Sequence, residues 1–271
     1  MEIKDLERAA ANVRITIVKA IHEAGSGHPG GSLSAADILT ALYFDIMNID
    51  PEHPDMEGRD KFVLSKGHAN PALYAVLAER GYFPKEDVMT LRKLGSRFQG
   101  HPNMDLVPGV DMSTGSLGQG FSAAVGMALA YRNDGSDGRI YVLLGDGELE
   151  EGIVWEAAMA ANHYKLSNMT VFVDHNKLQI DGRNDKVMTV DPIPEKFEAF
   201  GWSTIQIDGH DMRQIIDAAN QAKNTDGPTA IICETVKGKG VSFMEDAAGW
   251  HGKAPDDEQF AQAMKDLGGE E

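Results

Sequence analysis

The sequence predicts an α/β fold in which helices cover both faces of a parallel sheet. Residues 140–144 and 169–173 are short apolar runs, typical of strands that are buried on both faces. Between them, residues 153–164 carry apolar side chains at helical spacing. A strand, a helix and a strand in this order form a β-α-β unit. Such a unit should be parallel and right-handed, with both strand ends at one edge of the sheet.

Helices and strands also alternate through the first half of the chain. An apolar stripe predicts a helix over residues 4–24, and Gly25 is a typical helix stop. After a glycine-rich loop, the next helix should open at Ser34, where Ser-Ala-Ala-Asp resembles a capping box. The elements expected after it are a strand at 61–65, a helix ending near residue 80, a helix over 84–94 and a turn-rich loop over 95–111.

The second half of the chain continues the same alternation. The elements expected there are a helix from about 120 to 131, the central β-α-β unit, strands at 203–208 and 229–235, and a helix over 212–223. From about residue 256 the chain is acidic, and we expect one short helix that frays. The sequence shows no internal repeat and no low-complexity linker, so residues 1–271 are expected to form a single domain.

The composition argues against several classes of function. A formal net charge of −17 argues against nucleic-acid binding, which needs clustered Lys and Arg. No run approaches the roughly 18 apolar residues of a membrane span, and the N-terminus has no apolar signal core. The single cysteine, Cys233, lies in an apolar run and is expected to be a buried strand thiol, without a disulfide. We therefore expect a cytoplasmic protein that binds neither nucleic acid nor membranes.

A glycine-flanked aspartate follows the first central strand. Asp146 stands at the end of that strand and Asn176 just beyond the next, so their side chains should meet at one sheet edge. Gly145 and Gly147 would let the backbone approach a ligand closely. A carboxylate, an amide oxygen and a backbone carbonyl form an all-oxygen set that suits Mg²⁺ together with phosphate oxygens. The alternative is that Gly-Asp-Gly is only a turn.

Three histidines lie in expected loops, namely His28, His68 and His101, and His68 follows the end of an expected strand. Each can be a solvated loop imidazole or part of a site, because long loops in compact domains are often functional. Lys237 and Lys239 lie in a second glycine-rich stretch, after the last strand. They also have two interpretations, a solvated turn or a basic site at the same sheet edge.

The spacing of Asp146 and Asn176 resembles the thiamine-diphosphate-binding motif, in which GDG is followed by a spacer and an asparagine. In that family the Asp, the Asn and a carbonyl two residues further hold Mg²⁺ on the diphosphate, which implies a metal site at Asp146, Asn176 and the backbone of Leu178. The resemblance runs nearly end to end and is to the N-terminal, diphosphate-binding domain of transketolase. The matching stretches are SGHPGGSLSAADILTALY, FVLSKGHANPALYAVLAERG, GHP, STGSLGQG, GDGELEEGIVWEA, DHNKLQIDG and GWHG.

The resemblance implies roles for individual residues. His28, His68 and His101 would line the substrate channel, bind sugar hydroxyls and help to move protons, which suits a side chain with a pKa near 6.5. Glu151 would belong to a glutamate network across a subunit interface. The backbone at Gly115 and Leu117 would face the aminopyrimidine ring, and His251 would reach the diphosphate. The implied cofactor site comprises His68, Gly115, Ser116, Leu117, Gly145, Asp146, Gly147, Glu148, Asn176 and His251.

The resemblance also implies a partner chain. Ser116 stands where the family often has proline, although the backbone contacts there should survive. Full-length transketolases continue into a pyrimidine-binding domain with the glutamate that activates the thiazolium, and no acidic residue here can be given that role. We therefore expect the N-terminal subunit of a two-chain transketolase of the pentose phosphate pathway, active only with a separate C-terminal subunit, in two copies of each chain.

With that partner, the chain should transfer a two-carbon ketol unit from a ketose phosphate to an aldose phosphate. Two alternatives stay open, one of them an enzyme and one from a different class of function. The first is a subunit of a different thiamine-dependent enzyme, such as a deoxyxylulose-phosphate synthase or a ketoacid decarboxylase. The second is a non-catalytic protein that keeps the cofactor site and has lost the chemistry.

Overall fold

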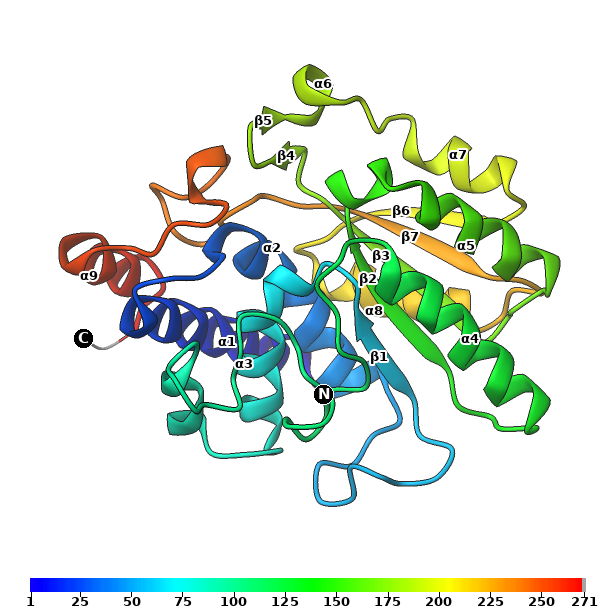
Figure 1. Ribbon diagram of the computed structural model, residues 1–271, viewed down its shortest axis with the longest axis horizontal. Helices are drawn as coiled ribbons and strands as arrows, with labels where there is room; N and C mark the ends of the chain where they lie inside the picture. Colours follow the sequence, from blue (N-terminus) through cyan, green and yellow to red (C-terminus); the bar gives the residue numbers. More distant parts are fainter. Residues whose placement is uncertain (270–271) are drawn as a thin grey trace.

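A five-stranded parallel sheet forms the centre of the computed structural model, which describes residues 1–269 (Figure 1). The strand order is β1-β2-β3-β7-β6, and every pairing is parallel. These strands are β1 (Lys61–Leu64), β2 (Ile140–Gly145), β3 (Met169–His175), β6 (Ser203–Asp208) and β7 (Thr229–Glu234). The predicted α/β fold with a parallel sheet is confirmed.

Helices cover both faces of the sheet. One face is covered by a layer of helices that comprises α1 (Ile3–Ala24), α2 (Pro29–Ala41), α3 (Asn70–Arg80) and α8 (Met212–Ala222), with α9 (Asp257–Asp266) packed on α1. The other face packs against α4 (Gln119–Asn133), α5 (Gly152–His163) and α7 (Ile193–Ala199). Successive side chains of a strand point to opposite faces, so Val142 joins the second group and Leu143 the first. This explains why the middle residues of the central strands, such as Val171, Phe172 and Val173, are apolar without alternation.

The strand register brings the predicted site residues to one edge. Gly145 of β2 pairs with Asp174 of β3, so Asp146 follows the end of β2 while Asn176 follows the end of β3. On its other side, β3 pairs with β7, and Asp174 lies opposite Cys233. Cys233 is a buried free thiol, as predicted. The carboxyl ends of these strands therefore form one continuous edge.

The second helix begins earlier than the sequence predicted. α2 starts at Pro29 and not at Ser34, so most of the predicted glycine-rich loop is helical. Pro29 suits the first helical turn, where a backbone N–H has no partner within the helix. A side chain on Gly30 would lie 2.9 Å from the Trp250 carbonyl oxygen, so this close approach requires a glycine. Tertiary packing here outweighs the low helix propensity of glycine.

The helix predicted over residues 84–94 is wrong. Only Lys85–Thr90 winds, as the 3₁₀ helix η3. Arg92 then adopts a φ of 58°, in the left-handed region through which a right-handed helix cannot continue. The other short turns are η1 (Leu42–Ile46, a π-helix) and the 3₁₀ helices η2 (Gly67–Ala69), η4 (Gly147–Glu150) and η5 (Ala248–Trp250).

The segment between β3 and α7 holds structure that the sequence analysis did not predict. It contains a small antiparallel hairpin, β4 (Leu178–Gln179) with β5 (Gly182–Arg183), and the short helix α6 (Asn184–Val187). In Figure 1 this segment projects beyond the carboxyl edge of the sheet. Three apolar side chains on it are exposed, Ile180, Val187 and Met188.

The acidic tail forms the predicted short helix, α9. Asp256 caps its N-terminus through a capping box with Gln259, which satisfies two otherwise unpaired backbone N–H groups. Ala263 and Met264 are fully buried in the same cluster as α1. Fraying was predicted for the chain end, of which residues 270–271 lie outside the described residues.

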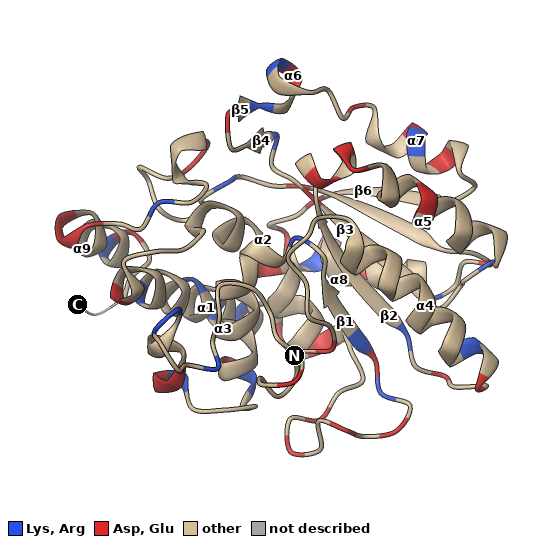
Figure 2. Cartoon of the chain, viewed as in Figure 1, with Lys and Arg blue, Asp and Glu red and all other residues tan. Residues whose placement is uncertain are grey.

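Acidic side chains are spread over elements on both sides of the sheet, including α5, α7 and α9 (Figure 2). This spread agrees with the net charge of −17. Within residues 1–269, no helix combines the length and the apolar character needed to cross a membrane.

Candidate active site

A cavity of about 270 Å³ lies at the carboxyl edge of the sheet. Its walls come from the segments that follow β1, β2, β3 and β7 and from the start of α2. It is lined by His28, Gly31, Lys66, His68, Gly115, Leu117, Gly145, Asp146, Gly147, Glu148, Asn176, Leu178, Gln179, Ile180, Lys237 and His251. The structure thus brings most of the predicted site residues together in one place.

Asp146 and Asn176 both line this cavity and are almost fully buried, at 3% and 5% exposure. The Asp146 carboxylate accepts hydrogen bonds from the backbone of Gly147 (2.8 Å) and of Lys177 (2.5 Å). Burial, together with the nearby charge of Asp174, raises the pKa of Asp146 above its ordinary value. A bound cation would reverse that shift, so this carboxylate is suited to hold positive charge.

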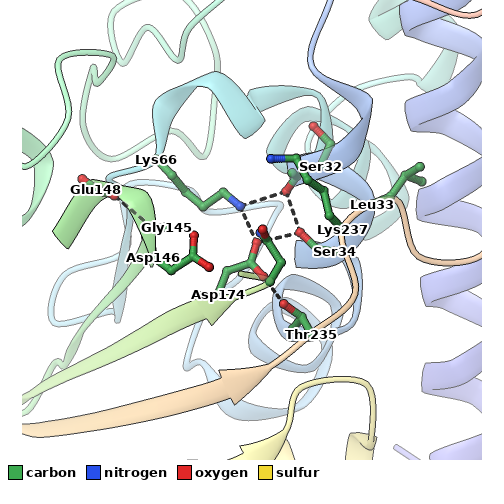
Figure 3. A network of polar contacts seen from close by, with 12 residues as sticks. Ser32, Leu33, Ser34, Lys66, Gly145, Asp146, Glu148, Asp174, Thr235 and Lys237 are labelled. Atoms are coloured by element: carbon green, nitrogen blue, oxygen red, sulfur yellow. Dashed lines mark hydrogen bonds and ion pairs between the residues drawn. The ribbon is translucent and has the colours of Figure 1, made fainter. Parts of the chain in front are cut away.

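A second buried carboxylate, Asp174, lies directly behind Lys66, a residue that lines the cavity, and we call these two residues the floor (Figure 3). It pairs with the buried ammonium of Lys66, and it accepts hydrogen bonds from the hydroxyls of Ser34 (2.6 Å) and Thr235. Lys66 also donates to the Gly31 carbonyl at 3.0 Å. Burial alone would raise the pKa of Asp174, but the charge and hydrogen bond of Lys66 hold it below its ordinary value. The floor is therefore an ionised pair that ties α2 to the ends of β1, β3 and β7.

Glu148, predicted to belong to the cofactor site, lines the cavity and also fixes its loops. Its carboxylate accepts hydrogen bonds from the Ser65 hydroxyl (2.5 Å) and from the backbone N–H groups of Gly118 (2.7 Å) and Gly145 (3.0 Å). Burial raises the pKa of this carboxyl group. Because three donors already occupy its oxygens, the side chain shapes the cavity wall.

Three histidines form a cluster inside the cavity. The ring centres of His28, His68 and His251 lie between 5.1 and 5.5 Å from one another. Burial and the charge of Arg92 lower the pKa of His28 to about 4, and burial and the charge of Lys237 lower the pKa of His251 to about 3. Burial also lowers the pKa of His68 well below its usual value. All three rings are therefore neutral near pH 7 and can each donate or accept a hydrogen bond.

Lys237 is part of the site and not of a solvated turn. It is 2% exposed, and its ammonium donates to the Leu178 carbonyl at 2.9 Å and lies 3.0 Å from Nδ1 of His251. Burial and the charge of Lys66 lower its pKa to about 8. Lys239 differs, because its side chain is 38% exposed and pairs with Glu245 on the surface.

Three predicted residues do not line the cavity. His101 and Ser116 are exposed, although His101 lies beside Gly115, where a side chain would meet its ring at 3.1 Å. Partial burial of the imidazole ring and the charge of Arg92 lower the pKa of His101. Glu151 is exposed at the N-cap of α5. His101 and Ser116 therefore lie at the border of the cavity, next to residues that line it, whereas Glu151 lies on the outer surface of this chain.

The donor set around Asp146 fits a magnesium ion. Within residues 1–269, no group of three or more His, Cys, Asp and Glu side chains is arranged to hold a metal. The expected set differs, because it consists of the Asp146 carboxylate, the Asn176 amide oxygen and the Leu178 carbonyl, all at the cavity wall. Such a set is typical of Mg²⁺ that also binds phosphate oxygens. The Leu178 carbonyl now accepts from Lys237, so a metal would share or replace that contact.

Comparison with known proteins gives the family of this chain. Residues 6–271 match the family described as transketolase, thiamine diphosphate binding domain. The chain belongs to the transketolase family. The predicted family is thus confirmed, and so is a thiamine diphosphate-binding domain.

The chain is 46% identical over 264 residues to the 6-deoxy-6-sulfo-D-fructose transketolase subunit SqwG of Clostridium sp., covering 97% of this chain and 96% of that protein. It is 42% identical over 268 residues to an apulose-4-phosphate transketolase subunit of Phocaeicola vulgatus, covering 98% and 95%. The crystal structure of transketolase from Campylobacter jejuni superposes with a TM-score of 0.94 at 34% identity, over 100% of this chain but 44% of that one.

These lengths distinguish two kinds of relative. The chain spans nearly the whole of the two named subunits and less than half of the Campylobacter transketolase. The two relatives that it spans are named as transketolase subunits, in agreement with the predicted subunit of a transketolase, a transferase of two-carbon ketol units. The names of these two relatives also imply a partner chain.

Proposed function

We propose that this transketolase subunit holds thiamine diphosphate through Mg²⁺ and, with a separate C-terminal subunit, transfers a ketol unit from a ketose phosphate to an aldose phosphate. The observation that carries the proposal is the buried cavity in which Asp146 and Asn176 meet a cluster of neutral histidines. Bound thiamine diphosphate supplies the electron sink for this chemistry. The residues of this chain bind it, orient it and move protons beside it.

The metal and the diphosphate would be held side by side in the cavity, because the Leu178 carbonyl lies 2.9 Å from the ammonium of Lys237. Asp146, Asn176 and the carbonyl of Leu178 are the metal ligands in this proposal. Lys237 and His251 would meet the negative charge of the diphosphate, since a buried ammonium forms strong, charge-assisted hydrogen bonds to phosphate oxygens. This arrangement compensates buried charges of both signs.

The remaining histidines would serve the sugar. His28 and His68 line the cavity, and His101 lies at its border, so together they would bind hydroxyl groups of the substrate. A neutral imidazole both donates and accepts, which suits hydroxyl recognition and proton transfer at a carbonyl. Glu151, exposed on the outer surface, would take part in contacts between subunits.

The partner would complete the site. We assign to it the acidic group that activates the cofactor, and we propose an assembly of two copies of each chain. The substrates named for the two relatives, a sulfonated fructose and a phosphorylated sugar, make an anionic ketose our first choice of donor. A cytoplasmic location and a place in the pentose phosphate pathway stay predictions.

Asp146→Ala tests the metal assignment. We expect this variant to lose Mg²⁺-dependent binding of thiamine diphosphate in calorimetry, because no other carboxylate of the expected donor set remains. Asp217→Ala is the control, since Asp217 is exposed on α8. Normal cofactor affinity in the Asp146 variant would show that the metal lies elsewhere.

The partner requirement is tested by turnover. The purified chain with Mg²⁺ and thiamine diphosphate should show no ketol transfer, and activity should appear when the partner chain is added. A ketose phosphate should serve as donor and pyruvate should not. A rate that is unchanged by the partner, or turnover with pyruvate alone, would contradict the proposal.

A further inference from the structure

The wall of the cavity that carries Lys237 is held from behind by a histidine outside the cavity. His210 lies in the turn between β6 and α8 and does not line the cavity. Its Nε2 receives the backbone N–H of Val236 at 2.9 Å. Val236 directly precedes Lys237, so His210 contacts the backbone next to a buried ammonium of the site.

The hydrogen bonds of His210 define its protonation state. A backbone amide can only donate, so Nε2 must carry a lone pair and no proton. Nδ1 lies 2.7 Å from a carboxylate oxygen of Asp37, which accepts, so the proton is on Nδ1. His210 is therefore a neutral imidazole in a single tautomer, with a donor on one side and an acceptor on the other.

Asp37 anchors this imidazole to the core. It is 6% exposed and receives both terminal nitrogens of Arg14, at 3.0 and 2.5 Å. Burial would raise the pKa of Asp37, but the hydrogen bond from His210 and the charge of Arg14 hold it below its ordinary value. Arg14 belongs to α1 and Asp37 to α2, so His210 bonds to a rigid, ionised pair.

The segment that His210 holds leads directly into the site. After β7, the N–H of Gly238 donates to the carbonyl of Gly30 at 3.0 Å, at the start of α2. Between these two anchors, Lys237 turns into the cavity and reaches Leu178 and His251. A shift of the backbone at Val236 would therefore move the ammonium away from its two partners.

We propose that His210 is a positioning residue for the cofactor site, which acts through the backbone of Val236 to seat Lys237 against the diphosphate. The inference rests on the proposed role of Lys237 in binding the diphosphate of thiamine diphosphate. The neutral imidazole is suited to this task, because one face is fixed to the Arg14–Asp37 pair and the other accepts from Val236.

Two substitutions separate the two contacts of His210. The amide of His210→Asn reaches about as far as Nδ1, so it keeps a donor for Asp37 and loses the acceptor for Val236. The amide of His210→Gln reaches about as far as Nε2, so it keeps an acceptor for Val236. If positioning of Val236 matters, His210→Asn should weaken cofactor binding and His210→Gln should largely preserve it. A role limited to the Asp37 contact predicts the reverse order.

The first measurement is the Kd of thiamine diphosphate for the complex of the chain with its partner, with Mg²⁺, by calorimetry. One lost backbone hydrogen bond corresponds to a Kd raised by about twofold to tenfold in His210→Asn, and we expect less than about twofold in His210→Gln. Equal Kd values in wild type and both variants, or a weaker His210→Gln, would overturn the inference.

A second measurement does not need the cofactor. Lys237 is almost fully buried, so its acylation by acetic anhydride in the full chain, followed by mass spectrometry, reports its seating. We expect Lys237 to be acylated several-fold faster in His210→Asn than in wild type and in His210→Gln. Unchanged labelling would overturn the positioning role. Wild-type chain that fails to bind the cofactor would instead contradict the proposed function, and the labelling would still decide the role of His210.

Discussion

Replacement of Lys66 by methionine removes the positive charge at the floor of the cavity. The change keeps the length of an unbranched, flexible side chain, so the lost packing is small. It leaves Asp174, which is 0% exposed, with two hydroxyl partners and no directly paired counter-charge. Removal of one partner of a buried ion pair costs about 3–5 kcal/mol. We therefore expect the free energy of unfolding to fall by about that amount.

Urea unfolding of the chain, followed by circular dichroism, measures this loss. Lys93→Met is the matched control, because Lys93 pairs with Glu23 on the surface and both side chains are about half exposed (47% and 55%). That pair should contribute less than about 1 kcal/mol. The double variant Lys66→Met/Asp174→Asn should be more stable than Lys66→Met alone, since it removes the uncompensated charge. If Lys66→Met costs no more than Lys93→Met, the floor does not depend on this ion pair.

Three further predictions concern the free energy of unfolding of the chain. Gly126→Ala should raise the free energy of unfolding in urea by about 0.5–1 kcal/mol, because the position is exposed in α4 and a Cβ would meet no atom within 4 Å. A lower free energy of unfolding would contradict this reasoning. Asp256→Ala should cost about 1 kcal/mol through the lost cap of α9, and an unchanged urea midpoint would mean that α9 contributes little. In the folded chain the pKa is about 4 for His28 and about 3 for His251, below the unfolded value of about 6.5. The unfolded chain therefore binds more protons, and the free energy of unfolding falls as the pH falls from about 6.5 towards 4. His251→Asn should make that loss smaller when urea midpoints are compared across pH, and an identical pH profile would contradict the assignment.

Local sequence signals were sufficient for the part of the site built on consecutive strands. Asp146 and Asn176 each follow an apolar strand within one β-α-β unit, so the right-handed, parallel connection brings them to the same edge. The glycines on either side of Asp146 indicated a turn close to a ligand. Chain order and strand periodicity thus determined both positions without knowledge of the tertiary contacts.

The buried charges could not be predicted in the same way. Lys66 and Asp174 are 108 residues apart, and neither lies in a pattern that indicates burial. Lys237 is buried because β4 offers the Leu178 carbonyl, and the sequence analysis did not predict that hairpin. The early start of α2 likewise depends on the contact of Gly30 with Trp250. Each of these features is set by partners distant in sequence, which local propensity does not report.

The bonds of Asp174 also determine how much of the site must become ordered when a ligand arrives. One carboxylate joins Ser34, Lys66 and Thr235, so these positions can separate only when a buried hydrogen bond or the buried ion pair is broken. A ligand therefore meets a floor that is already at its final spacing and loses little conformational entropy there. The projecting segment around Ile180 is held by more exposed contacts, such as the hydrogen bond from Gln179 to Glu150 at 2.7 Å. We therefore expect more of the entropic cost of ligand capture to fall on that segment and on the partner chain.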